Sequence, residues 1–155
     1  MTRKSKPHAK HGGGSYVALS RFALQSQSFA KLSPHAVKLL LDFMAGYSGF
    51  SNGDLSMPWS HAVTRGWRSR DTLNKALKEL LDNGWLIKTR QGGRRSRTCC
   101  LYAITLFAID DCRHKNGASK FDPGITPTER PPGGWYRDPP TAVVKMSNAS
   151  PSTGY

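Results

Sequence analysis

Four arginines surround a glycine pair in the stretch Arg90-Gln91-Gly92-Gly93-Arg94-Arg95-Ser96-Arg97. Two adjacent glycines permit a tight turn, so we expect this stretch to form the tip of a hairpin. Guanidinium groups gathered at one tip repel one another unless water or an anion lies against them, and we favour phosphate as that anion. Edge strands often carry basic residues that prevent aggregation, but that need does not account for four arginines around one tip.

A second group of polar side chains follows Ser69, where apolar residues begin to recur at helical spacing. The opposite face of this expected helix carries Asn74, Lys75 and Lys78. An Asn can bond both N6 and N7 of adenine, and a Lys or Arg can bond O6 and N7 of guanine. A solvated helix face also mixes polar residues in this way, so the surrounding elements must decide between the two interpretations.

The amino end of the same helix is a further candidate contact, because its free backbone amides attract anions. Asp71 has two interpretations there: it complements the positive end of its own helix, which we take first, or it accepts a hydrogen bond from cytosine N4. The full set of candidate DNA-contacting residues is Arg68, Ser69, Arg70, Thr72, Asn74, Lys75, Lys78, Arg90, Arg94, Arg95 and Arg97.

The cysteines and histidines form no recognised catalytic or metal-binding pattern. Cys99 and Cys100 are adjacent on an expected strand and would point to opposite faces, while Cys112 lacks the second close pair of a structural zinc site. We expect Cys99 or Cys100 to be a small buried residue. No glycine-rich phosphate loop follows a strand. The sequence therefore predicts no enzyme activity, no cofactor and no bound metal.

A helix-turn-helix is expected to position the polar helix. The first helix is predicted over residues 57–64, the turn over 65–68 and the second helix over 69–83, with Ser69 as its N-cap. Two helices joined by a short turn that contains Gly can lay the second helix in a DNA major groove.

Strands are expected on both sides of the arginine-rich tip, over residues 85–89 and 98–105, with a third short strand over 54–56. Upstream, Ser33-Pro34 is expected to begin a helix that runs to Met44. Residues 16–32 are expected to be extended with one or two helical turns. These turns are predicted to pack three apolar residues against the following helix, namely Phe22, Leu24 and Phe29.

The run from Gly66 to Leu80, followed by Asn83-Gly84-Trp85-Leu86-Ile87, resembles the winged helix-turn-helix superfamily. It is most similar to small regulators and replication proteins of bacterial phages, plasmids and other mobile elements. The resemblance covers residues 16–107. It implies an α+β fold of about three helices with a small antiparallel sheet, a recognition helix at 69–83 in the major groove and a wing at 90–97 on the phosphate backbone. It implies DNA binding more strongly than any one biological role.

The composition points to a polyanionic partner, because 23 Lys+Arg against 10 Asp+Glu give a formal net charge of +13. Double-stranded DNA is the partner we expect. No continuous apolar stretch predicts a membrane span, and the start of the chain lacks the pattern of a secretory signal. We therefore expect a cytoplasmic protein that associates with the nucleoid.

The chain divides into a flexible basic arm at 1–15, one domain at 16–112 and a disordered tail rich in Pro, Gly and Ser at 113–155. The arm either contacts phosphates or the minor groove, or only aids solubility. The pair Trp135-Tyr136 in the tail is either a docking motif for a protein partner or incidental.

The function predicted from the sequence is that of a sequence-specific transcriptional regulator. The alternative is a replication initiation or accessory protein of a plasmid or phage, in which the tail recruits another factor. A weaker alternative is a winged helix that contacts RNA or protein. A homodimer is a further expectation, because many helix-turn-helix proteins address two half-sites.

Overall fold

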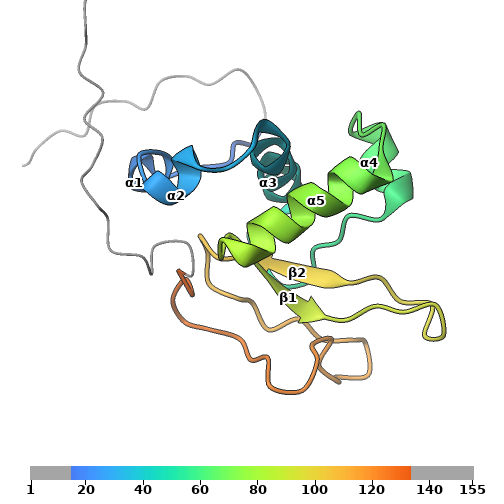
Figure 1. Cartoon of the computed structure of the whole chain (residues 1–155). Helices are drawn as coiled ribbons and strands as arrows, with labels where there is room; N and C mark the ends of the chain where they lie inside the picture. Colours follow the sequence, from blue (N-terminus) through green and yellow to red (C-terminus); the bar gives the residue numbers. More distant parts are fainter. Residues whose placement is uncertain (1–14, 134–155) are drawn as a thin grey trace, which may run out of the picture.

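The computed structural model describes residues 15–133, which contain five helices and a two-stranded antiparallel sheet (Figure 1). The helices are α1 (Arg21–Leu24), α2 (Gln27–Ala30), α3 (Pro34–Gly46), α4 (Trp59–Thr64) and α5 (Arg70–Asp82). The strands are β1 (Leu86–Arg90) and β2 (Leu101–Ile104). The predicted α+β class is confirmed, with two more helical segments than the three expected.

The two long helices, α3 and α5, pack against each other and supply eight of the 17 buried residues of the main core. Each begins at a serine whose hydroxyl accepts an amide hydrogen bond from the first turn: Ser33 from Ala36 at 3.2 Å, and Ser69 from Thr72 at 3.3 Å. Glu79 of α5 links the helices, because its carboxylate accepts both the amide and the hydroxyl of Ser33, at 2.6 and 2.7 Å. The predicted N-cap at Ser69 and the predicted start of α3 at Ser33-Pro34 are confirmed.

The sheet is shorter than predicted and contains a β-bulge. Leu86 pairs with Ile104 and Lys88 with Tyr102, but the register shifts before Arg90, which pairs with Leu101. The bulge leaves Thr89 as the extra residue and increases the local twist. The predicted third strand is reduced to a single bridge, in which Leu55 and Tyr102 exchange hydrogen bonds of 3.3 and 2.8 Å.

The segment before α3 forms two single-turn helices, α1 and α2, as predicted for residues 16–32. Phe29 packs against the core, with its ring edge-on to Trp85 at 5.7 Å between centroids, where the prediction had placed it against α3. The prediction for Phe22 and Leu24 is wrong: they are 56% and 41% exposed, and Ala23 between them is buried. Successive residues of a helix are turned by about 100°, so the orientation that buries Ala23 turns Phe22 and Leu24 toward solvent.

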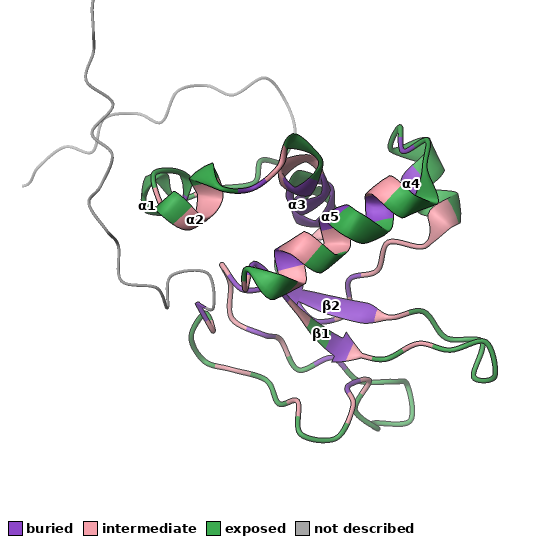
Figure 2. Cartoon of the chain, viewed as in Figure 1, coloured by how far each residue is buried: buried purple, intermediate pink, exposed green. Residues whose placement is uncertain are grey.

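Residues 109–133 form a segment that we call the C-terminal strap, and it covers the sheet face opposite α5 (Figures 1 and 2). Leu86, Tyr102 and Ile104 belong to the helical core, whereas their neighbours Ile87 and Ala103 contact the strap. This alternation is expected for a sheet covered on both faces. The buried strap residues in this second cluster are Ile109, Cys112 and Phe121.

The prediction of a disordered tail from residue 113 is therefore wrong for residues 113–133. Backbone hydrogen bonds hold this part of the strap, among them Asp122 to Thr89 at 2.8 Å and Thr128 to Ile109 at 2.9 Å. The rest of the predicted tail, with Trp135-Tyr136, and residues 1–14 of the predicted arm lie outside the described residues.

Candidate nucleic-acid interface

The turn between α4 and α5 is held by one buried carboxylate on α3, that of Asp42, which is 7% exposed. Its oxygens accept hydrogen bonds from the Trp67 indole at 2.8 Å, from Arg65 Nε at 3.0 Å and from Lys38 Nζ at 2.8 Å. Lys38 also donates to the Arg65 carbonyl at 2.8 Å. Gly66, at φ 86°, lets the chain reverse between the two anchored residues. Asp42 thus sets where α5 begins relative to α3.

The charge of Asp42 is stabilised by these donors. Burial alone would raise the pKa of this carboxyl, but hydrogen bonds from Lys38, Trp67 and Arg65 outweigh burial, and the pKa lies below its ordinary value. Sequence reasoning missed this residue. The signal was an acidic residue within the otherwise apolar run Leu39-Leu40-Leu41-Asp42-Phe43-Met44.

The exposed face of α5 carries cations that are already paired with acids of the same helix. Lys75 Nζ lies 2.8 Å from the Asp71 carboxylate, and Lys78 pairs with Asp82. The hydrogen bond and the attraction from Asp71 raise the pKa of Lys75. Asn74, which directly precedes Lys75, is exposed, and its side-chain amide makes no hydrogen bond to any residue in 15–133.

Asp71 is therefore an ion-pair partner as well as a first-turn acid. The sequence interpretation considered only the helix dipole and cytosine for this residue. The spacing of four residues between Asp71 and Lys75, repeated between Lys78 and Asp82, was the available signal for both pairs.

At the amino end of α5 the predicted contact residues differ in availability. Arg68 is exposed, and Arg70 lies over the Trp59 ring at 5.3 Å from its centroid. The Ser69 hydroxyl is occupied as the helix cap, and Thr72 is half-buried above it. Arg68 and Arg70 are thus the cations at this end that can reach a ligand, while Ser69 shapes the helix.

Residues 91–100, between β1 and β2, form the arginine loop. A bridge between Gly93 and Thr98 closes its tip, with the Gly93 amide 3.1 Å from the Thr98 carbonyl. Gly92 is required below the tip, because a Cβ there would lie 2.5 Å from the Cys100 amide nitrogen. Arg97 adopts a left-handed backbone at φ 51°, a conformation that few non-glycine residues take outside turns.

Three arginines at this tip, Arg94, Arg95 and Arg97, are exposed, as the loop in Figure 2 shows. Their guanidinium groups form no ion pair or hydrogen bond within the part of the chain that the structure describes. Arg90 differs from them: it is half-buried at the end of β1 and donates to the Cys99 carbonyl at 3.1 Å. Arg90 is therefore a residue of the loop base, where the sequence interpretation placed it at the tip.

Among the described residues, no group of three or more His, Cys, Asp or Glu side chains could hold a metal ion. Cys99 is exposed, whereas Cys100 is half-buried and packs against the main core, so the prediction of a buried cysteine at this pair holds only in part. Cys112 is the buried one. Burial, with Asp54 and Asp110 nearby, raises the pKa of its thiol to about 11.

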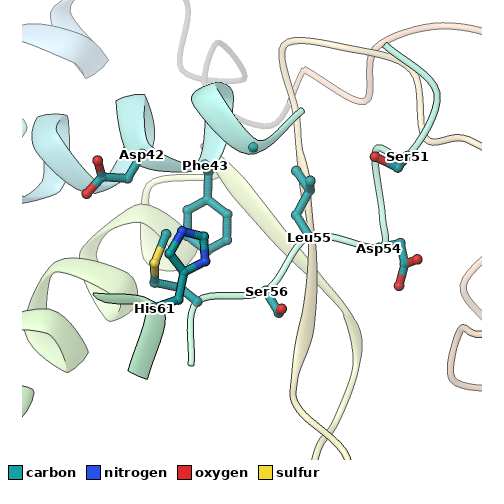
Figure 3. A pocket seen from close by; sticks show the side chains of 9 residues that line it. Asp42, Phe43, Ser51, Asp54, Leu55, Ser56 and His61 are labelled. Atoms are coloured by element: carbon teal, nitrogen blue, oxygen red, sulfur yellow. The ribbon is translucent and has the colours of Figure 1, made fainter. Parts of the chain in front are cut away.

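A hollow lies between the end of α3 and the segment before α4 (Figure 3). Two carboxylates line it, but both are occupied: Asp42 by the turn, and Asp54 by an ion pair with Lys120. In Figure 3 the Asp42 carboxylate points away from Phe43 and His61. The hollow therefore offers no pair of free carboxylates for acid–base chemistry.

In Figure 1 the amino end of α5 and the tip of the arginine loop lie on the same side of the molecule, at the right of the view. No helix in residues 15–133 is long and apolar enough to cross a membrane. Comparison of the chain with protein-family models, with curated proteins and with solved structures finds no match.

Proposed function

We propose that the protein binds double-stranded DNA as a winged helix-turn-helix. In this proposal α5 enters the major groove and the arginine loop acts as the wing on the phosphate backbone. The observation that carries the proposal is the group of three exposed arginines, Arg94, Arg95 and Arg97, which lack an acidic partner within residues 15–133. Unpaired arginines at a hairpin tip are suited to phosphate, which they bind in bidentate geometry.

The order of elements supports this proposal. A helix, α3, is followed by the pair α4 and α5 and then by an antiparallel hairpin, and Leu55 adds a bridge to that hairpin. The turn between α4 and α5 is fixed by Asp42, so the two helices keep one relative orientation. A rigid turn allows a recognition helix to present its side chains in register with base edges.

Base reading in this proposal centres on Asn74. It is the exposed amide in the middle of α5, and an Asn can bond adenine at N6 and N7. Lys75 and Lys78 are secondary contacts, because each must exchange an acidic neighbour for DNA. Arg68 and Arg70, at the amino end of the helix, are placed to contact phosphate or guanine.

The resemblance to small regulators of mobile elements favours a sequence-specific transcriptional regulator over a replication protein. Selection of bound fragments from a random duplex pool at near-physiological salt tests this function. We expect enrichment of one motif that contains an adenine whose readout depends on Asn74. Retention of structured RNA in preference to duplex DNA would contradict the proposal. Occurrence of the enriched motif only at replication origins would transfer the role to replication.

A further inference from the structure

The base of the arginine loop is held from outside the sheet by one residue of the C-terminal strap, Asp122. Its amide donates to the Thr89 carbonyl at 2.8 Å, and its carboxylate accepts the Gln91 amide at 2.7 Å. These two bonds lie on either side of Arg90, at Thr89, the last but one residue of β1, and at Gln91, the first residue of the loop. Asp122 thus clamps the chain where the strand ends.

The loop needs such a support because the sheet provides little at this point. The ladder is interrupted by the bulge at Thr89 and ends at the pair of Arg90 with Leu101. Beyond it, the bridge between Gly93 and Thr98 is the next backbone pairing between the two arms. A two-stranded hairpin on its own is only marginally stable, so the direction of the loop depends on what holds its base.

Asp122 is itself fixed by the two strap residues before it. Phe121 packs tightly on Gly53: a Cβ atom at position 53 would lie 2.6 Å from the Phe121 ring. Lys120 forms an ion pair with Asp54. Gly53 in turn accepts the Thr89 hydroxyl at 2.6 Å, so the strap, the segment before α4 and the base of the loop form one connected unit.

We infer that Asp122 is a positioning residue for DNA binding, which aims the arginine loop at the backbone by holding the Gln91 amide. The inference rests on the proposed function. Simple electrostatics predicts the opposite effect, because a carboxylate near the arginines repels DNA and its removal should strengthen binding. The positioning role predicts that loss of the hydrogen-bond acceptor weakens binding even though a negative charge is removed.

Three substitutions in the full chain separate acceptor from charge. Asp122→Asn keeps an acceptor and loses the charge, Asp122→Glu keeps the charge and displaces the acceptor by one methylene, and Asp122→Ala loses both. Affinity for one duplex at fixed salt, the thermal unfolding midpoint and hydrogen exchange of the Gln91 amide are measured for each. We expect Asp122→Ala and Asp122→Glu to bind about five- to tenfold more weakly, with faster exchange at Gln91, and Asp122→Asn to bind at least as tightly as the unmodified chain.

Tighter binding by both Asp122→Ala and Asp122→Asn would overturn the inference in favour of charge alone. If Asp122→Ala fails to fold, the comparison of Asp122→Glu with the unmodified chain still decides, because both carry the negative charge and they differ in the position of the acceptor. Weaker binding by Asp122→Glu supports the positioning role, and unchanged binding overturns it. Absence of duplex binding by the unmodified chain would be a different result. It would overturn the proposed function, and the positioning role with it.

Discussion

Helix α5 and the arginine loop both expose cations, but they differ in what those cations already contact. On α5, Lys75 and Lys78 each have an acid four residues away. The loop lies within residues 83–109, a stretch of sequence that contains no Asp or Glu. A formal net charge of +13 therefore does not reveal which cations are available to a polyanion. The spacing of acidic residues near each cation reveals which cations are available.

Under the proposed function, this difference predicts separate roles for the two regions. An exposed ion pair on a helix contributes about 0.3–0.5 kcal/mol to stability, so a lysine can exchange its acidic partner for a DNA phosphate. The displaced carboxylate then lies near the phosphates and repels them. The loop arginines have no acid to displace. We therefore expect the loop to supply most of the salt-dependent affinity and α5 to supply most of the sequence preference.

Removing the anchor of α5 is the most disruptive way to test its role. Asp42→Ala leaves the Trp67 indole without its acceptor and separates Lys38 and Arg65 from their shared anion. We expect the free energy of unfolding to fall by about 2–3 kcal/mol, below the value for a fully buried pair because both cations are partly exposed. Urea unfolding followed by tryptophan fluorescence measures this loss. Asp82→Ala, an exposed acid on α5, is the control and should change stability by less than about 0.5 kcal/mol.

The contribution of Asp42 depends on pH in a defined direction. Its pKa in the folded protein lies below its ordinary value, so the charge stabilises the fold above the unfolded pKa of about 3.9. This stabilisation disappears as the pH falls through the folded pKa. The stability gap between the unmodified chain and Asp42→Asn should therefore shrink as the pH is lowered below about 4. A gap that stays constant from pH 7 to pH 3 would show that the charge of Asp42 does not anchor the turn.

Removing the loop arginines tests whether the loop supplies most of the affinity for duplex DNA. Replacing Arg94, Arg95 and Arg97 together by Ala should weaken binding to all duplexes by roughly a hundredfold at moderate salt, with little change in motif preference. The control removes three exposed cations elsewhere by replacing Arg21, Lys31 and Arg130, which gives the same change in net charge. Filter binding at one salt concentration compares the two. Similar losses in both variants would mean that total charge, and not the loop, sets the affinity.

The proposed base-reading role of α5 predicts a smaller and selective effect on binding. Asn74→Ala should reduce discrimination between the preferred motif and a single adenine substitution by about 1–2 kcal/mol. Affinity for unrelated duplexes should stay nearly constant, because the side chain carries no charge. Competition binding with matched and substituted duplexes provides the measurement. A uniform loss across all sequences would place Asn74 at the backbone instead.

Removing the acidic partners of the α5 lysines should make the helix, like the loop, bind duplex DNA with less dependence on sequence. Replacing Asp71 and Asp82 together by Asn releases Lys75 and Lys78 and removes two negative charges from the helix face. We expect binding to unrelated duplexes to strengthen several-fold and motif discrimination to decline, because the helix gains sequence-independent contacts. Unchanged binding in this variant would indicate that the acids of α5 lie away from the DNA.

Local signals were sufficient to predict the elements of the central unit. The cap at Ser69, the start of α3 at Ser33-Pro34 and the amphipathic pattern of α5 each depend on neighbouring residues. The hairpin tip was also predicted, but its turn lies at residues 94–97, and not at Gly92-Gly93. The ion pairs on α5 were also readable from their spacing, although the sequence interpretation assigned Lys75 to bases. Such features need no knowledge of distant contacts.

The strap and the Asp42 anchor could not be predicted in the same way. Phe121 and Cys112 are isolated apolar residues in a segment rich in Pro and Gly. Backbone hydrogen bonds to Thr89 and Ile109 help to hold this segment in place. Side-chain type does not encode such bonds. Asp42 contacts residues more than twenty positions away, at Arg65 and Trp67. Its role depends on how α3 and α4 pack, which periodicity does not specify.

The salt dependence of duplex binding tests the central claim most directly. The slope of log affinity against log salt is measured for the unmodified chain, for the triple variant of Arg94, Arg95 and Arg97, and for Lys75→Ala with Lys78→Ala. Loss of three phosphate contacts should reduce the slope by about 2.7, whereas the paired lysines of α5 should change it by less than about 1. An equal or larger reduction in the α5 variant would contradict the account, because it would show that the charge-compensated helix, rather than the arginine loop, holds the backbone.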